Sequence, residues 1–174
     1  GEGGLMALNT TPGDQEADSY VSVADCAAYA TKKGAAFPAS PIEPAEQALR
    51  RATAWIDATF RIRFPGAATD VWQNLEWPRA GVIYRGEAYD ETKIPQQVKD
   101  ATCEAAIREI AKPGSLSPDL ERGGAIKSLK AGSVEIEYAD GADPATTFTT
   151  IDGLLSGFLL PAKGKTSTSF VARA

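Results

Sequence analysis

Arginine and aromatic side chains alternate along one stretch of the chain, from Arg50 to Arg85. The stretch holds six arginines and no lysine against three acidic residues, a local net charge of +3 in a 174-residue chain whose net charge is −5. In grooves that bind single-stranded nucleic acid, arginines contact phosphates and aromatic rings stack on bases. Protein–protein hot spots use the same residue types. The candidate contact residues are Arg61, Arg63, Trp72, Trp77, Arg79 and Arg85.

Three interpretations of this stretch stay open, and we favour them in the following order. In the first, the rings hold a long loop onto the helices and the arginine stems cover them. In the second the stretch is a protein interface, and in the third it binds nucleic acid. Trp55 recurs with the apolar residues of a predicted helix, and we expect it in the core.

No other set of residues has the spacing that catalysis or ligand binding needs. The chain contains no histidine, the commonest general base and zinc ligand in proteins. Gly164, Lys165 and Thr166 resemble the end of a phosphate-binding loop, but Leu159 stands where that motif needs its first glycine. We therefore expect no enzyme activity, no catalytic residue, no metal site and no cofactor.

The helices that must position the candidate residues follow from apolar spacing and capping signals. A first helix is expected to begin after the N-cap Ser22 and to end at Gly34. A second runs from Pro44 to Phe60, because apolar side chains recur there at three- and four-residue steps. A third helix begins at about Pro95.

The segments between and after these helices complete the predicted fold. Residues 61–93 show no sustained period, and a loop of that length in a compact domain is expected to pack as a structured unit. Alternating apolar residues predict a β-hairpin at about 125–138, and a short closing helix begins near Thr150 or Asp152. The predicted fold class is mainly α: a small helical bundle with a long structured loop and a C-terminal β-hairpin plus a short helix.

One domain is expected over residues 17–161. Residues 1–16 are interpreted as an expression-tag remnant and a disordered N-terminus, and residues 162–174 as a flexible C-terminal tail. Cys26 and Cys103 lie among alanines in predicted helices and are expected to be buried thiols, with a disulfide left open. No apolar run reaches the roughly 20 residues that span a bilayer.

Four segments in a fixed order carry a resemblance to a known family: ADSYVSVADCAAYA, AEQALRRATAWIDATF, FPGAATDVWQNLEWPRAG and IPQQVKDATCEAA. The most specific part is the Gln-x-Leu-x-Trp-Pro-Arg segment that begins at Gln73 and is followed by Ile94 and Pro95. The series resembles tailed-phage head–tail connector (adaptor) proteins, in particular the branch labelled phage DnaT-like single-stranded DNA-binding proteins. The resemblance covers about residues 17–161.

This resemblance implies a structural subunit without catalytic residues, in a ring of typically twelve copies under the portal protein. The ring would extend the DNA channel, let DNA pass without sequence-specific contact and receive a stopper or tail-completion protein. That role implies the virion neck, and the host cytoplasm before assembly. The tail would dock on the portal through Lys163, Lys165 and Arg173.

The name of the branch suggests an alternative function. In this alternative the chain is a DnaT-like single-stranded DNA-binding protein that uses the arginine and aromatic residues of 50–85. The net charge of −5 argues against this alternative, since phosphate contacts need local positive charge.

Overall fold

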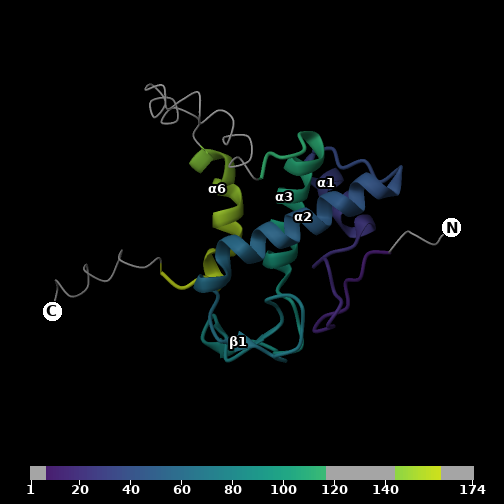
Figure 1. Ribbon diagram of the computed structural model, residues 1–174. Coiled ribbons are helices and arrows are strands. Elements are labelled where there is room, and N and C mark those ends of the chain that lie inside the picture. The colour runs from purple at the N-terminus through teal and green to yellow at the C-terminus, as the bar shows by residue number, and fades with distance from the viewer. Residues whose placement is uncertain (1–6, 117–143, 162–174) are drawn as a thin grey trace, which may run out of the picture.

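The computed structural model describes residues 7–116 and 144–161. Within these residues the chain forms four α-helices and two short 3-10 turns, joined by a loop region with four two-residue strands (Figure 1). This is the small, mainly α-helical fold that the sequence predicts. The predicted hairpin at 125–138 and the tail at 162–174 lie outside the described residues. The helices are α1 (Val23–Lys33), α2 (Ile42–Phe60), α3 (Gln96–Ala111) and α6 (Pro144–Leu155).

The capping signals of α1 lie where the sequence predicts them. The Ser22 hydroxyl accepts the backbone N–H of Asp25 at 3.1 Å, so one of the free donors at the helix start is satisfied. Gly34 ends the helix in the left-handed region with a φ of 73°. Lys32 and Lys33 occupy the last turn, where the helix dipole favours positive charge.

Helix α2 buries the apolar stripe that its spacing predicts. It begins at Ile42, two residues before the expected Pro44, and ends at Phe60. Trp55 is only half-buried, and its ring packs against Phe60 and Phe148 with centroids 5.8 and 4.8 Å away. The six fully buried members of the predicted stripe are Ala45, Ala48, Leu49, Ala52, Ile56 and Phe60.

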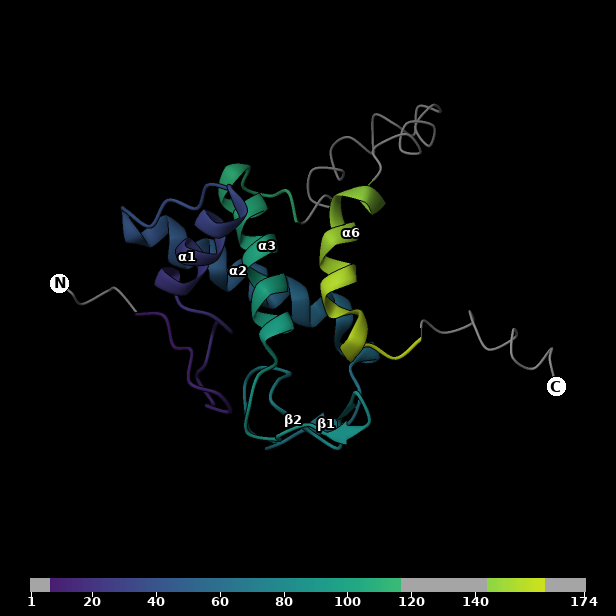
Figure 2. The ribbon, with the colours of Figure 1, turned by 180° about the vertical axis from the view of Figure 1, so that it is seen from behind.

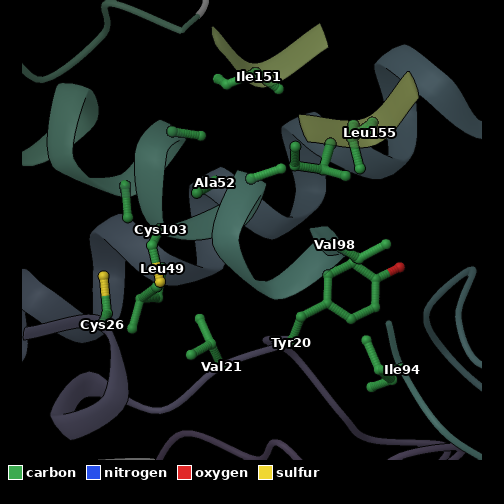
Figure 3. Packing of buried hydrophobic residues seen from close by; sticks show 14 of the residues in the cluster. Tyr20, Val21, Cys26, Leu49, Ala52, Ile94, Val98, Cys103, Ile151 and Leu155 are labelled. Atoms are coloured by element: carbon green, nitrogen blue, oxygen red, sulfur yellow. The ribbon is translucent and has the colours of Figure 1, made fainter. Parts of the chain in front are cut away.

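The helices share one hydrophobic core. Helix α2 runs across the molecule and packs against α3, which also contacts α1 and α6 (Figures 1 and 2). Side chains from all four helices meet in this core, among them Cys26, Leu49, Val98 and Ile151 (Figure 3). Small residues of α2 and α3 at the contact allow the helices to approach closely. Cys26 and Cys103 are both buried free thiols, as the sequence predicts, and they do not form the disulfide that the sequence left open.

Residues 61–95, which we call the loop module, form a unit at one end of the helices (Figure 2). The 3-10 turn η1 (Arg61–Arg63) leads from α2 into it. Strand β1 (Ala67–Ala68) pairs with β2 (Arg79–Ala80), and β3 (Ile83–Tyr84) pairs with β4 (Glu87–Ala88), both antiparallel.

Gly66 is the position where the loop module tolerates no side chain. A Cβ atom there would stand 2.1 Å from the Ala80 carbonyl oxygen, and the φ of 69° is left-handed. The chain therefore needs glycine to bring β1 against β2.

Two segments differ from the sequence predictions. Residues 7–16, expected to be disordered, form a hydrogen-bonded turn. The Asn9 N–H donates to Asp18 Oδ1 at 2.8 Å, and the Asp18 N–H donates to the Asn9 carbonyl at 2.8 Å. Asn74 of the loop module also donates to the Ala17 carbonyl at 2.7 Å, which a sequence pattern does not reveal. Helix α6 begins at Pro144 instead of near Thr150 or Asp152, and proline suits the first turn of a helix. The 3-10 turn η3 (Ser156–Phe158) follows α6.

Among the helices of the described residues, none combines the length and the apolar character needed to cross a membrane.

Candidate nucleic-acid interface

A buried chain of hydrogen bonds ties the loop module to α2. The Tyr20 hydroxyl donates to Asp57 Oδ1 at 2.5 Å and accepts the Trp77 backbone N–H at 3.2 Å. The backbone N–H of Glu76 donates to Asp57 Oδ2 at 3.1 Å. Burial raises the pKa of the Asp57 carboxyl to about 6 and holds the pKa of Tyr20 well above its usual value. The backbone at 76–77 is thereby fixed relative to α2.

Trp77 is a core residue of the loop module. Only 1% of it is exposed, and its ring meets Phe64 and Phe158 edge to face at 5.4 and 5.6 Å. Phe158 in turn stacks on Tyr84 at 4.3 Å. The aromatic side chains of the module therefore hold it against η3, which is the structural role that the first interpretation gave them.

Arg79 is buried and fully engaged within the module. Its guanidinium donates to the carbonyls of Pro65 and Gly66 at 2.7 and 2.9 Å, and to the Glu76 carboxylate at 2.9 Å. Each bond gives a buried guanidinium N–H an acceptor in place of the water that burial removes. Arg79 therefore braces the base of the β1–β2 hairpin and does not face a ligand.

Trp72 stands at the tip of the β1–β2 hairpin and faces solvent. It is 71% exposed and its neighbour Val71 is 81% exposed. The turn beneath them is closed by the Gln73 N–H donating to the Asp70 carbonyl at 3.1 Å. An exposed tryptophan on a closed turn is a surface on which a flat ring can stack.

Arg85 stands at the tip of the β3–β4 hairpin. Arg85 and Gly86 form the two-residue turn, with φ values of 55° and 85°, both left-handed. For a residue other than glycine this conformation costs about 1 kcal/mol. The guanidinium lies 5.1 Å from the centroid of the Tyr84 ring and, among the described residues, forms no ion pair.

The turn η1 presents two further arginines and an apolar side chain. Arg61 is exposed and forms an ion pair with Glu76 at 3.4 Å. Arg63 is partly exposed and donates to the Leu160 carbonyl at 2.9 Å. Ile62 between them is 84% exposed. This turn therefore carries positive charge beside an apolar surface.

The loop module as a whole is balanced in charge. It holds five basic and five acidic residues. Glu76 already neutralises part of the charge of Arg61 and of Arg79. Positive charge alone therefore gives a polyanion little attraction to this unit, and short-range contacts must supply most of any affinity.

The structure divides the candidate residues that the sequence predicts. Trp72, Arg61, Arg63 and Arg85 reach solvent on the loop module. Trp77 and Arg79 do not, because the ring of Trp77 packs in the core and the guanidinium of Arg79 bonds to oxygen atoms within the protein. The candidate tail residues Lys163, Lys165 and Arg173 lie outside the described residues.

Sequence reasoning missed Asp57, the residue that anchors the module. Asp57 lies between Thr53 and Phe60 on the buried face of α2, so an acidic residue interrupts an otherwise apolar stripe. A buried carboxylate needs hydrogen-bond donors. Its position in the stripe was therefore a signal that another part of the chain supplies a hydrogen-bond donor, which the structure shows to be Tyr20.

The fold and this surface define a small helical protein whose loop module exposes a tryptophan and three arginines, residue types that single-stranded nucleic-acid-binding proteins use. A family model described as "Putative DnaT-like ssDNA binding protein" matches residues 6–174. The chain belongs to this family. Comparisons with curated proteins and with solved structures find no match for the chain.

The head–tail connector interpretation is therefore wrong. The matching family is one of DnaT-like single-stranded DNA-binding proteins and not of connectors, so the portal and stopper partners and the ring of twelve lose their support. The interpretation that the sequence offered as its alternative agrees with the family.

Proposed function

We propose that the protein binds single-stranded DNA, with bases stacking on Trp72 and phosphates contacting Arg61, Arg63 and Arg85. The observation that carries this proposal is membership of the DnaT-like family over residues 6–174. The exposure of Trp72 supports the choice of contact surface. The protein acts without catalysis in this proposal.

Stacking on Trp72 and contacts between arginines and phosphates both contribute to the affinity in this proposal. A base stacked on an aromatic side chain contributes about 1–3 kcal/mol. Three arginine–phosphate contacts on single-stranded DNA predict a slope of about −2 in log K against log salt concentration, or a roughly 20-fold loss of affinity between about 50 and 200 mM salt. The slope is this small because the proposed surface makes only three phosphate contacts.

The test is fluorescence anisotropy of a labelled oligo(dT) of about 20 nucleotides, a length that spans one or more typical single-strand sites. Trp72→Ala should weaken binding by roughly 5- to 150-fold. Arg85→Ala should reduce the magnitude of the salt slope by about 0.7. A duplex of mixed sequence should bind more weakly than single strands, because its bases are already stacked on one another.

Matched controls lie on exposed parts of the helices. Ile42→Ala removes an exposed apolar side chain from the start of α2, and Lys32→Ala removes an exposed cation from α1. Both should leave the affinity within about twofold of the wild type. Absence of binding at the lower salt, or equal affinity for the duplex, would contradict the proposed function.

A further inference from the structure

Two polar side chains, those of Asp70 and Gln73, hold the turn that carries Trp72. Asp70 Oδ1 accepts the backbone N–H of Trp72 at 2.9 Å, which is the geometry of an Asx turn. The Asp70 N–H donates in turn to Gln73 Oε1, also at 2.9 Å. The two side chains thus bond the backbone on both sides of Val71 and Trp72.

Gln73 also ties the turn to the rest of its hairpin. Its amide nitrogen Nε2 donates to the carbonyls of Leu75 and Pro78 at 2.8 and 3.0 Å. The Thr69 N–H donates to the same Pro78 carbonyl at 3.1 Å. All the polar atoms of the Gln73 side chain are therefore used to close the loop between β1 and β2.

We propose that Asp70 and Gln73 are positioning residues that hold Trp72 in the orientation in which it stacks on a base. This inference rests on the proposed function. Because Trp72 is 71% exposed, few neighbouring side chains pack against its indole ring, and the orientation of the residue depends on the turn that carries it. A contact group that is ordered before binding loses less conformational entropy on binding. The Gln-x-Leu-x-Trp-Pro-Arg segment gains a role here, since its first residue organises the preceding turn.

Asp70 contributes two effects of opposite sign. Its carboxylate orders the turn, but its negative charge repels the phosphates of DNA that approaches Trp72. Asp70→Asn keeps an oxygen that accepts the Trp72 N–H and removes the charge. Asp70→Ala removes both. The two variants therefore separate the ordering of the turn from its charge.

The expected result is a change of opposite direction in the two variants. Asp70→Asn should bind oligo(dT) about twofold more tightly than the wild type, from the loss of one repulsive charge at about 10 Å. Asp70→Ala gains the same charge effect but should bind about threefold more weakly than the wild type, because fewer molecules hold the stacking conformation. Gln73→Ala should weaken binding by about fivefold on the same ground.

A double-mutant cycle separates positioning from a merely structural role. In the Trp72→Ala background, Asp70→Ala and Asp70→Asn should bind with equal affinity, since no ring remains to be positioned. Asp90 gives a matched control, because its carboxylate accepts the Thr92 N–H at 2.8 Å in a similar turn that carries no tryptophan. Asp90→Ala and Asp90→Asn should therefore change the affinity in the same direction. Gln96→Ala is the control for loss of an exposed amide.

The outcomes distinguish this inference from the proposed function. If Trp72→Ala weakens binding while the two Asp70 variants bind equally, the positioning role is overturned and the function stands. If the difference between the Asp70 variants persists in the Trp72→Ala background, positioning of Trp72 is likewise overturned. If the wild-type protein does not bind oligo(dT), the proposed function and this inference both fail.

Discussion

At the scale of single residues, burial decides which members of the arginine and aromatic stretch can meet a ligand. Trp77 and Trp72 are five positions apart, yet one packs among aromatic rings and the other faces solvent. Arg79 and Arg85 differ in the same way, since one is surrounded by oxygen atoms of the protein and the other lies over a tyrosine ring. Residue type alone did not separate the members of either pair.

Asp57 should make the stability of the protein depend on pH. Its pKa is about 6 in the folded protein, against 3.8 for an exposed aspartate, because burial disfavours the charged form. A carboxyl group whose pKa is higher in the folded than in the unfolded protein contributes its full stabilisation at pH values below the unfolded pKa. This contribution is lost as the pH rises through the folded pKa. Between pH 4 and pH 7 the wild type should therefore lose about 2 kcal/mol of unfolding free energy relative to Asp57→Asn.

Urea unfolding of both proteins across this pH range measures that difference. Carbon-13 NMR of the Asp57 carboxyl, which should titrate near pH 6 in the folded protein, identifies the group responsible. A constant difference in unfolding free energy from pH 4 to pH 7 would show that Asp57 is not the source.

At the scale of elements, the predictable parts are those whose signals are local. The Ser22 cap, the Gly34 stop and the buried stripe of α2 all follow from a few neighbouring residues. The β3–β4 hairpin was missed, because Arg85 occupies a left-handed turn position that usually holds asparagine, aspartate or glycine. Tyr20 and Asp57 were not paired in advance, because 37 residues separate them and no local pattern links them.

The end of α3 offers a prediction at this scale. Glu109 is buried in the last turn, where its carboxylate accepts the N–H groups of Gly114 and Leu116 at 3.0 and 3.3 Å and pairs with Arg51 at 2.5 Å. Glu109→Ala leaves the buried Leu116 N–H and the half-buried Gly114 N–H without this acceptor and should lower the unfolding free energy by about 2–3 kcal/mol. Chemical denaturation measures this loss.

The exposed Glu43 of α2 provides the control for that change. Glu43→Ala should alter the unfolding free energy by no more than about 0.5 kcal/mol, because no buried group depends on it. A Glu109→Ala variant as stable as the Glu43→Ala variant would contradict the role of Glu109 as the acceptor for Gly114 and Leu116.

At the scale of the whole molecule, the loop module and the helices share one hydrophobic core. Phe64, Trp77 and Phe158 belong to the same cluster of buried side chains as Leu49 of α2 and Val98 of α3. Unfolding in urea should therefore be a single transition. Far-UV circular dichroism, which reports the helices, and near-UV circular dichroism, which reports the aromatic cluster, should give the same midpoint. Separate midpoints would show that the module unfolds by itself.

The unequal surroundings of the three tryptophans also give the protein an optical reporter. Trp77 is enclosed and Trp55 is half-buried, so the long-wavelength part of the emission should come from Trp72. A base that stacks on the indole should quench this part and leave the remainder unchanged. Trp72→Phe, which keeps a ring but removes the indole, should abolish the quenching while retaining much of the affinity. The intrinsic fluorescence of the unlabelled protein can thus report whether a ligand has reached the tip of the β1–β2 hairpin.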